Sequence, residues 1–116
     1  MSYNRPVDVL IGRWEAGLVR DGTHSHATLK WMCDAVEGFF ADHQRVKYPE
    51  QIQITDSEDW RIGKLDDGVA WNVVRADLCA VKAFFNYLRR EHEEYSGLDN
   101  PIYVPPPKRK TLDTVV

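Results

Sequence analysis

The sequence predicts an all-α fold of four helices followed by an extended C-terminal tail. Apolar residues recur at helical spacing in four separate stretches, and turn-forming pairs or prolines separate these stretches. The alternation of apolar and polar residues that is typical of β-strands is missing. With 116 residues, 43% of them hydrophobic, the chain can form one domain with a substantial core. Short connections between the helices favour a small orthogonal bundle.

The first two helices are defined by their apolar spacing and their ends. Pro6 is well placed to open the first helix, and Asp21-Gly22 ends it. The expected core positions of this helix are Val7, Leu10, Ile11, Trp14 and Leu18. The second helix starts after a cap at Thr23 or Ser25, and the Tyr48-Pro49 pair breaks it, because a residue before proline avoids helical geometry. Its expected core positions are Leu29, Met32, Val36, Phe39 and Phe40.

The third helix is short and the fourth is the longest. The third helix is predicted over residues 52–65, with Ile52 and Ile54 as candidate core anchors and a cap at Thr55 or Asp56. A turn at residues 66–68 precedes the fourth helix, which is expected over residues 69–94 and is stopped by Ser96-Gly97. Its apolar stripe comprises Val74, Leu78, Val81, Phe85 and Leu88. Everything after Asn100-Pro101 is expected to be extended.

Composition excludes few functions. A net charge of −3 and a pI of about 5.8 favour no particular partner and count against a basic nucleic-acid-binding domain. Cys33 and Cys79 lie inside apolar helical patterns and are expected to be buried free thiols. The sequence has no stretch long enough to span a membrane and no secretory signal pattern at its start, so a cytoplasmic location is expected.

One face of the fourth helix carries a pattern typical of nucleic-acid contacts. Its members lie within about 100 degrees of one another around the helix, opposite the apolar stripe. Arginine and lysine supply charge for phosphates, and asparagine supplies paired hydrogen bonds to base edges. An ordinary solvated face explains the same pattern, so both interpretations stay open. The row consists of Asn72, Arg75, Cys79, Lys82, Asn86 and Arg89.

The start of the second helix gives a weaker signal. Its polar residues could approach a DNA backbone with the free amides of the helix N-terminus, or they could simply cap the helix. These residues are Ser25, His26, Thr28 and Lys30. Farther along, Asp34 and Glu37 would repel phosphate. Trp31 points away from the apolar stripe and either packs on a neighbouring helix, with the first helix expected, or forms a partner surface.

Metal and catalytic sites are not expected in this chain. His24 and His26 flank Ser25, but no third ligand stands nearby in sequence, so no metal is predicted. No phosphate-binding glycine loop or nucleophile elbow is present. The chain by itself is therefore not expected to be an enzyme or to hold a cofactor.

Five segments together resemble the N-terminal core-binding domain of tyrosine recombinases, the phage-integrase family. In order they are "VLIGRWEAGL", "THSHATLKWM", "IQITDSEDW", "LCAVKAFFNYLRRE" and "NPIYVPPPK". The resemblance implies a four-helix SAM-like bundle over residues 1–100 and a linker over residues 101–116 toward a catalytic domain that this chain lacks. It further implies that Lys108, Arg109 and Lys110 lie against phosphates as the linker crosses the duplex.

In that family the domain clamps duplex DNA at the recombination site, together with the catalytic domain of the same polypeptide and other recombinase protomers in a synaptic assembly. By position, Lys82 matches the basic residue before the family's Phe-Phe pair, and Asn72 and Arg75 fall at the start of the last helix. The chain departs from the family pattern at Met32-Cys33-Asp34 and at Val73, Ala76 and Asp77. These departures predict weak DNA binding with little base specificity. The alternative is a helical protein–protein interaction module without nucleic-acid binding.

Overall fold

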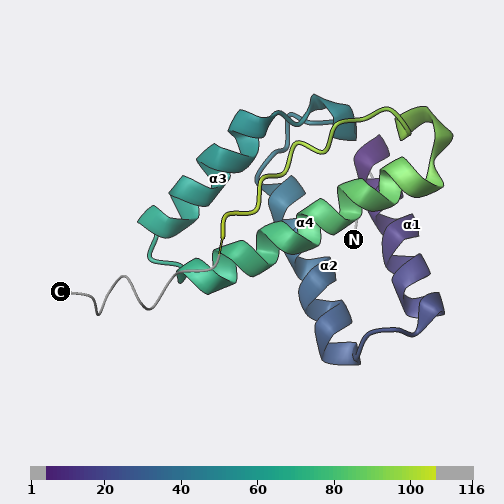
Figure 1. Ribbon diagram of the computed structural model, residues 1–116, viewed down its shortest axis with the longest axis horizontal. Helices are drawn as coiled ribbons and strands as arrows, with labels where there is room; N and C mark the ends of the chain where they lie inside the picture. The colour runs from purple at the N-terminus through teal and green to yellow at the C-terminus, as the bar shows by residue number, and fades with distance from the viewer. Residues whose placement is uncertain (1–4, 107–116) are drawn as a thin grey trace.

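The structure, a computed structural model, describes residues 5–106 and confirms the predicted all-α fold of four helices. These are α1 (Pro6–Asp21), α2 (His26–Ala41), α3 (Ile54–Asp66) and α4 (Trp71–Glu91), with two single-turn 3-10 helices, η1 (Pro49–Gln51) and η2 (Glu93–Tyr95). Helices α1 and α2 form an antiparallel pair, α4 crosses α2, and α3 packs on α4 (Figure 1).

Aromatic side chains from α2 and α4 form the centre of the core. Phe39, Phe40, Phe84 and Phe85 are fully buried. The rings of Phe40 and Phe84 meet edge to face with their centroids 5.7 Å apart, and Trp14 of α1 meets Phe84 in the same way at 5.7 Å. Edge-to-face contacts of this kind add stability beyond the burial of area alone. The core therefore fixes α4 against both α1 and α2.

The predicted starts and stops of the helices are partly confirmed. Pro6 occupies the first position of α1, and Gly22 ends it with a φ of 64°, in the left-handed region that favours glycine. Ser25, not Thr23, caps α2: its Oγ accepts a hydrogen bond from the Thr28 amide at 3.2 Å. Helix α4 is shorter than the predicted 69–94, because Ala70 and His92 have extended backbones.

The predicted cap and one predicted anchor of α3 were wrong. The helix begins two residues earlier than a cap at Thr55 requires and three earlier than a cap at Asp56 requires, with Gln53 as the N-cap residue. Asp56 instead lies in the first turn and accepts a hydrogen bond from the Gln53 amide at 2.7 Å. Ile52 is buried as predicted, but Ile54, the first residue of the helix, is 57% exposed.

Both cysteines are free, but neither is fully buried as predicted. Cys33 lies on the flank of α2 that faces α1 and its acidic neighbours, and Cys79 lies on the outer side of α4, where only part of each side chain is covered. Cys33 falls beside the apolar stripe of α2, and Cys79 falls on the side of α4 opposite its apolar stripe.

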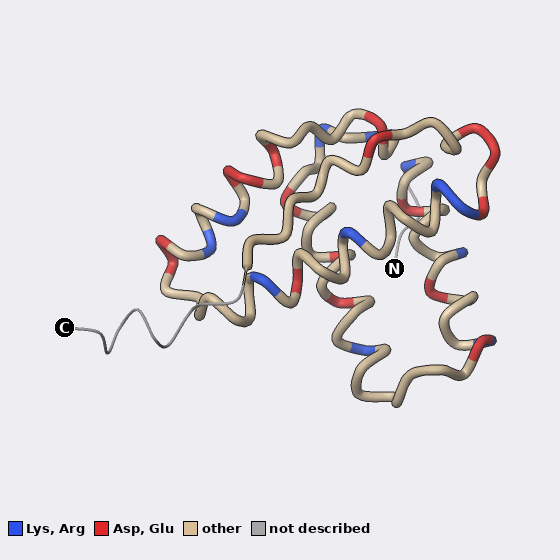
Figure 2. Tube along the Cα trace, in the orientation of Figure 1, with Lys and Arg blue, Asp and Glu red and all other residues tan. Residues whose placement is uncertain are grey.

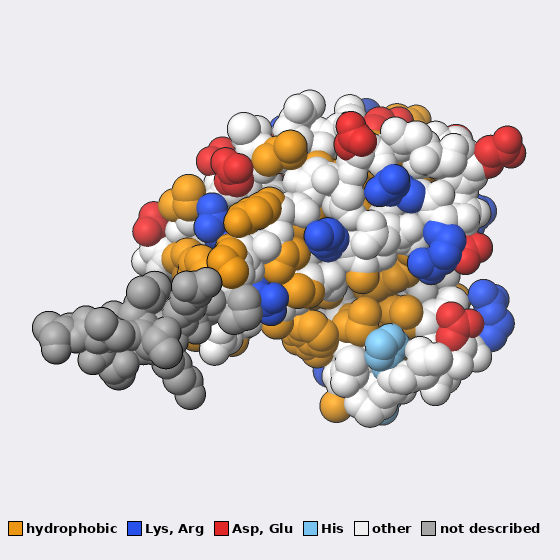
Figure 3. Space-filling model, viewed as in Figure 1, with side chains coloured by type: hydrophobic (Ala, Val, Ile, Leu, Met, Phe, Trp, Pro, Cys, Tyr) orange, Lys and Arg blue, Asp and Glu red, His pale blue; other side chains and the backbone are white. Residues whose placement is uncertain are grey.

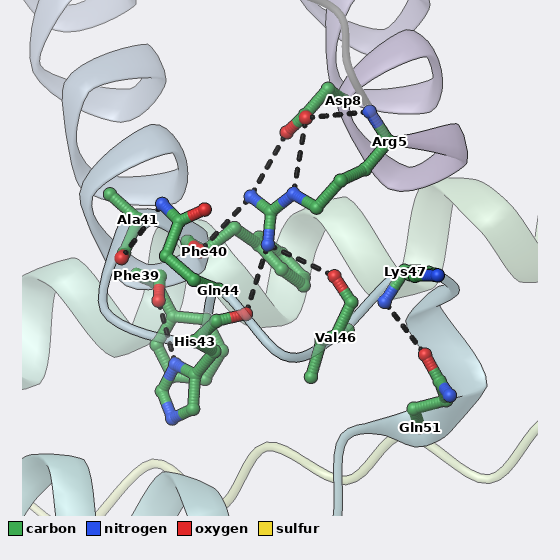
Figure 4. A network of polar contacts seen from close by, with 10 residues as sticks. All are labelled: Arg5, Asp8, Phe39, Phe40, Ala41, His43, Gln44, Val46, Lys47 and Gln51. Atoms are coloured by element: carbon green, nitrogen blue, oxygen red, sulfur yellow. Dashed lines mark hydrogen bonds and ion pairs between the residues drawn. The ribbon is translucent and has the colours of Figure 1, made fainter.

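A guanidinium group closes the end of α2, a feature that the sequence did not predict (Figure 4). Arg5 donates hydrogen bonds to the main-chain oxygens of Phe40, His43 and Val46 at 2.9–3.0 Å. Its Nε and Nη2 also bind both carboxylate oxygens of Asp8, each at 3.1 Å. Phe40 lies in the last turn of α2, whose carbonyls lack partners within the helix, whereas His43 and Val46 lie in the loop that follows. Arg5 therefore connects the start of α1 to the end of α2 and to the loop after it.

The chain after η2 turns back and runs along α4 in an extended conformation, as Figure 1 shows. Pro101, Ile102 and Pro105 are buried, and Ile102, only 3% exposed, belongs to the hydrophobic core. The packed unit therefore extends past the predicted boundary at residue 100 and includes at least residues 101–106. We call residues 100–106 the return segment.

Candidate nucleic-acid interface

The polar row predicted on the fourth helix lies on the outer side of α4, as expected, and is here called the α4 ridge. It comprises Asn72, Arg75, Cys79, Lys82, Asn86 and Arg89. Asn72, Lys82, Asn86 and Arg89 are exposed, and Arg75 is half-buried. Figure 2 shows Lys and Arg recurring along the length of α4. On the face seen in Figure 3, basic side chains stand among uncharged and hydrophobic surface, while acidic side chains lie toward the edges. This face is thus less acidic than the net charge of the chain suggests.

The three cations of the α4 ridge are not neutralised by neighbours. Within residues 5–106, no carboxylate forms an ion pair with Arg75, Lys82 or Arg89. Arg90, one residue beyond the ridge, differs because its Nε lies 3.1 Å from Glu91 Oε1. Unpaired cations in a row are available to an anionic partner such as a phosphate backbone.

The return segment lies against part of this ridge, which sequence patterns did not reveal. Arg75 Nε donates a hydrogen bond to the main-chain oxygen of Pro105 at 2.9 Å. Asn100 Nδ2 donates to the Lys82 main-chain oxygen at 3.1 Å and to Asn86 Oδ1 at 3.0 Å. Between segment and helix runs a shallow groove lined by Arg75, Cys79, Lys82, Ala83, Asn86 and Val104. Two expected DNA contacts, Arg75 and Asn86, are therefore partly engaged by the chain itself.

The polar residues at the start of α2 are mostly used within the helix. Ser25 and Thr28 bind each other, since Ser25 Oγ also lies 3.0 Å from Thr28 Oγ1. Lys30 Nζ is 2.7 Å from Asp34 Oδ2, and this carboxylate raises the pKa of the lysine. His26 is exposed. The capping interpretation accounts for Ser25 and Thr28, and the charge of Lys30 is compensated.

Trp31 packs toward α4, whereas α1 was the expected neighbour. Its Nε1 donates to Asp77 Oδ1 at 3.1 Å, and 39% of its surface stays exposed. Burial raises the pKa of Asp77, although the hydrogen bond from Trp31 and the charge of Lys64 oppose this rise. An apolar hollow lies beside the Trp31 side chain and is lined by Ala27, Lys30, Trp31, Asp34, Ala35, Val73 and Asp77.

An acidic cluster between α1 and α2 was also not predicted from the sequence. Burial raises the pKa of Glu15 to about 8, with a further contribution from the like charge of Glu37. The Oε2 atom of Glu15 is buried without a hydrogen-bond partner. Burial and the nearby Glu15 also raise the pKa of Cys33 to about 12. This thiol therefore stays protonated near neutral pH and is a poor nucleophile.

Clusters of metal ligands and membrane-spanning helices were both sought among the described residues. Among residues 5–106, no three His, Cys, Asp or Glu side chains gather closely enough to hold a metal ion. No helix in the same range is both long and apolar enough to cross a membrane. Lys108, Arg109 and Lys110, the predicted phosphate contacts of the tail, lie outside the described residues.

Comparison of the chain with protein-family models, with curated proteins and with solved structures finds no match.

Proposed function

We propose that this chain is a DNA-binding module that lies against duplex DNA through the α4 ridge. The main observation in favour of this proposal is a row of three cations that have no carboxylate partners among the described residues: Arg75, Lys82 and Arg89. Asn72 precedes these cations and Asn86 lies between Lys82 and Arg89, where asparagine amides can bind phosphate or base edges. Phosphate contacts of this kind position a protein on DNA with little dependence on sequence.

The order of sequence motifs supports a more specific role, as the core-binding domain of a tyrosine recombinase. In this role the module would hold one side of a recombination site for a catalytic domain of the same polypeptide. Other protomers would assemble with it at synapsis. Binding by the isolated module is expected to be weak, with a Kd no better than about 10⁻⁴ to 10⁻⁶ M at physiological salt, as for non-specific association.

The test measures binding to a mixed-sequence duplex by fluorescence anisotropy between 50 and 200 mM salt. Each phosphate contact that a cation makes contributes about 0.9 to the slope of log affinity against log salt. The double variant Arg75→Ala/Lys82→Ala should therefore bind more weakly and lower that slope by about two. A matched double variant, Arg13→Ala/Lys47→Ala, removes the same charge from α1 and the α2–η1 connection.

The control should retain nearly the parent slope. Equal slopes for both double variants would remove the α4 ridge as the interface, and a parent that shows no salt-dependent binding would overturn the function.

A protein–protein interaction module is the second candidate. The hollow beside Trp31 favours it, because Val73 is 50% exposed there and Trp31 is 39% exposed. Aromatic residues that keep both an apolar face and a polar atom accessible are common in protein interfaces. The affinity of such a complex should fall in the Trp31→Ala variant and should change little with salt concentration. The same salt titration therefore separates the two candidate functions.

A further inference from the structure

The return segment is fixed to α4 along its whole length. Its polar anchors are Asn100, whose Nδ2 reaches the Lys82 main-chain oxygen, and Pro105, whose oxygen accepts from Arg75. Trp71 Nε1 adds a hydrogen bond to the Pro106 oxygen at 3.3 Å. Between the polar anchors, Ile102 enters the core. Lifting the segment would expose Ile102 and break all of these bonds, so a ligand on this face meets helix and segment together.

Side chains of the segment alternate between the core and solvent. Ile102 is 3% exposed, whereas the next residue, Tyr103, is 53% exposed. The Tyr103 hydroxyl has no hydrogen-bond partner among residues 5–106. In the chain Tyr103 lies between the anchor of the segment at Lys82 and its anchor at Arg75. An exposed tyrosine hydroxyl without a partner is a suitable donor to a phosphate oxygen that approaches these cations.

Arg75 links the segment to the cationic row. Its Nε is committed to Pro105, but none of the described residues accepts a hydrogen bond from its two terminal nitrogens. A guanidinium carries five N–H donors in a planar fork, so one edge can hold the segment while the terminal nitrogens bind an anion. Lysine, with a single ammonium group, cannot reproduce this geometry.

We propose that the return segment is a fixed part of the duplex-facing surface, in which Tyr103 donates a hydrogen bond to a DNA phosphate and Arg75 positions the segment beside the α4 ridge. This inference rests on the proposed function and assigns DNA-contacting roles to residues outside the helices. It also gives Arg75 two roles, one in holding the segment and one toward the phosphate.

The first test replaces one hydroxyl group. Tyr103→Phe should lower the affinity for the mixed-sequence duplex about 3- to 10-fold, the size expected for the net contribution of one ordinary hydrogen bond at a solvent-exposed position. The slope of affinity against salt should not change, because no cation is lost. Tyr48→Phe is the matched control, since Tyr48 is similarly exposed at 46% and comes from the α2–η1 connection. It should bind as the parent does.

The second test follows the segment itself by amide hydrogen exchange at Ile102, Tyr103 and Val104. Duplex should slow exchange at these amides in the parent. Arg75→Lys keeps the positive charge, so the slope of affinity against salt should stay at the parent value. In the absence of DNA, exchange at these amides should become faster than in the parent. The affinity for the duplex should fall several-fold. Arg89→Lys, with the same change at a ridge residue that makes no bond to the segment, should leave exchange unaltered.

The outcomes separate this inference from the proposed function. If the parent binds DNA and Lys82→Ala lowers the salt slope, but Tyr103→Phe and Tyr48→Phe bind alike, the inference fails and the function stands. Faster exchange in the return segment on adding duplex would also overturn the inference, because it would mean that DNA displaces the segment from α4. A parent without salt-dependent binding overturns both.

Discussion

At the scale of single residues, some of the side chains that hold this fold together are polar, and periodicity does not identify them. Arg5 lies just before α1, yet it binds main-chain oxygens up to 41 positions away in sequence. Glu15 lies on the flank of an amphipathic helix, yet its environment keeps it from ionising normally. Hydrophobic spacing predicted the apolar faces of α1 and α2, but it contains no information on which polar groups meet across them.

Arg5→Lys should destabilise the fold by about 2–4 kcal/mol, because an ammonium group cannot serve three carbonyls and a carboxylate at once. Urea unfolding followed by circular dichroism measures the change. Arg13→Lys on the exposed side of α1 is the matched control and should change stability by less than about 0.5 kcal/mol. Similar values for the two variants would contradict the role of Arg5 in closing the end of α2.

Glu15 makes a prediction about pH. Its pKa is raised from 4.5 to about 8 in the folded chain, so between these values the folded state keeps a proton that the unfolded state releases. Stability should therefore fall as pH rises from 5 to 8, by about 1–2 kcal/mol once solvent screening of this half-buried group is allowed for. Glu15→Gln should flatten the decline in urea unfolding series, whereas the exposed Glu93→Gln should not.

At the scale of elements, α4 shows what a long periodic pattern can predict. All five positions of the predicted stripe are buried, and the opposite ridge faces outward. Ala80 and Phe84 are also buried, although the stripe did not include them. The ends of elements were less predictable. Several residues near the start of α3 can cap a helix, and only the observed backbone distinguishes a cap at Gln53 from one at Thr55 or Asp56. The shifted start leaves Ile54 exposed.

The observed start of α3 gives a direct comparison of two neighbouring residues. Asp56→Ala should destabilise the fold by about 1 kcal/mol, because it removes the acceptor for the Gln53 amide and a favourable charge at the helix N-terminus. Asp56 also pairs with Arg45, so part of the loss comes from this contact. Thr55→Ala, at an exposed position, should cost much less in thermal unfolding. A larger loss of stability for Thr55→Ala than for Asp56→Ala would instead favour Thr55 as the N-cap residue.

At the scale of the whole molecule, the sequence predicted the four helices and their outward cationic row, but not what lies against that row. The extended conformation after Asn100 could be predicted from its prolines. Its direction could not, because it depends on the hydrogen bonds of Arg75 and Asn100 and on the entry of Ile102 into the core. These are contacts between distant positions, which local patterns do not encode. A predicted linker thus contributes its first residues to the candidate interface.

Truncation tests whether the return segment belongs to the folded unit. A chain ending at Asp99 loses the burial of Ile102 and the hydrogen bonds made by Asn100 and to Pro105, and should lose about 3–5 kcal/mol of stability. A chain ending at Pro106 keeps all of these contacts and should unfold at nearly the same urea concentration as the full chain. Equal stability of the two truncated chains would instead place the boundary of the helical unit at residue 100. Because the shorter chain also leaves the outer face of α4 bare, its duplex affinity relative to the longer chain shows directly whether the segment contributes to binding or obstructs it.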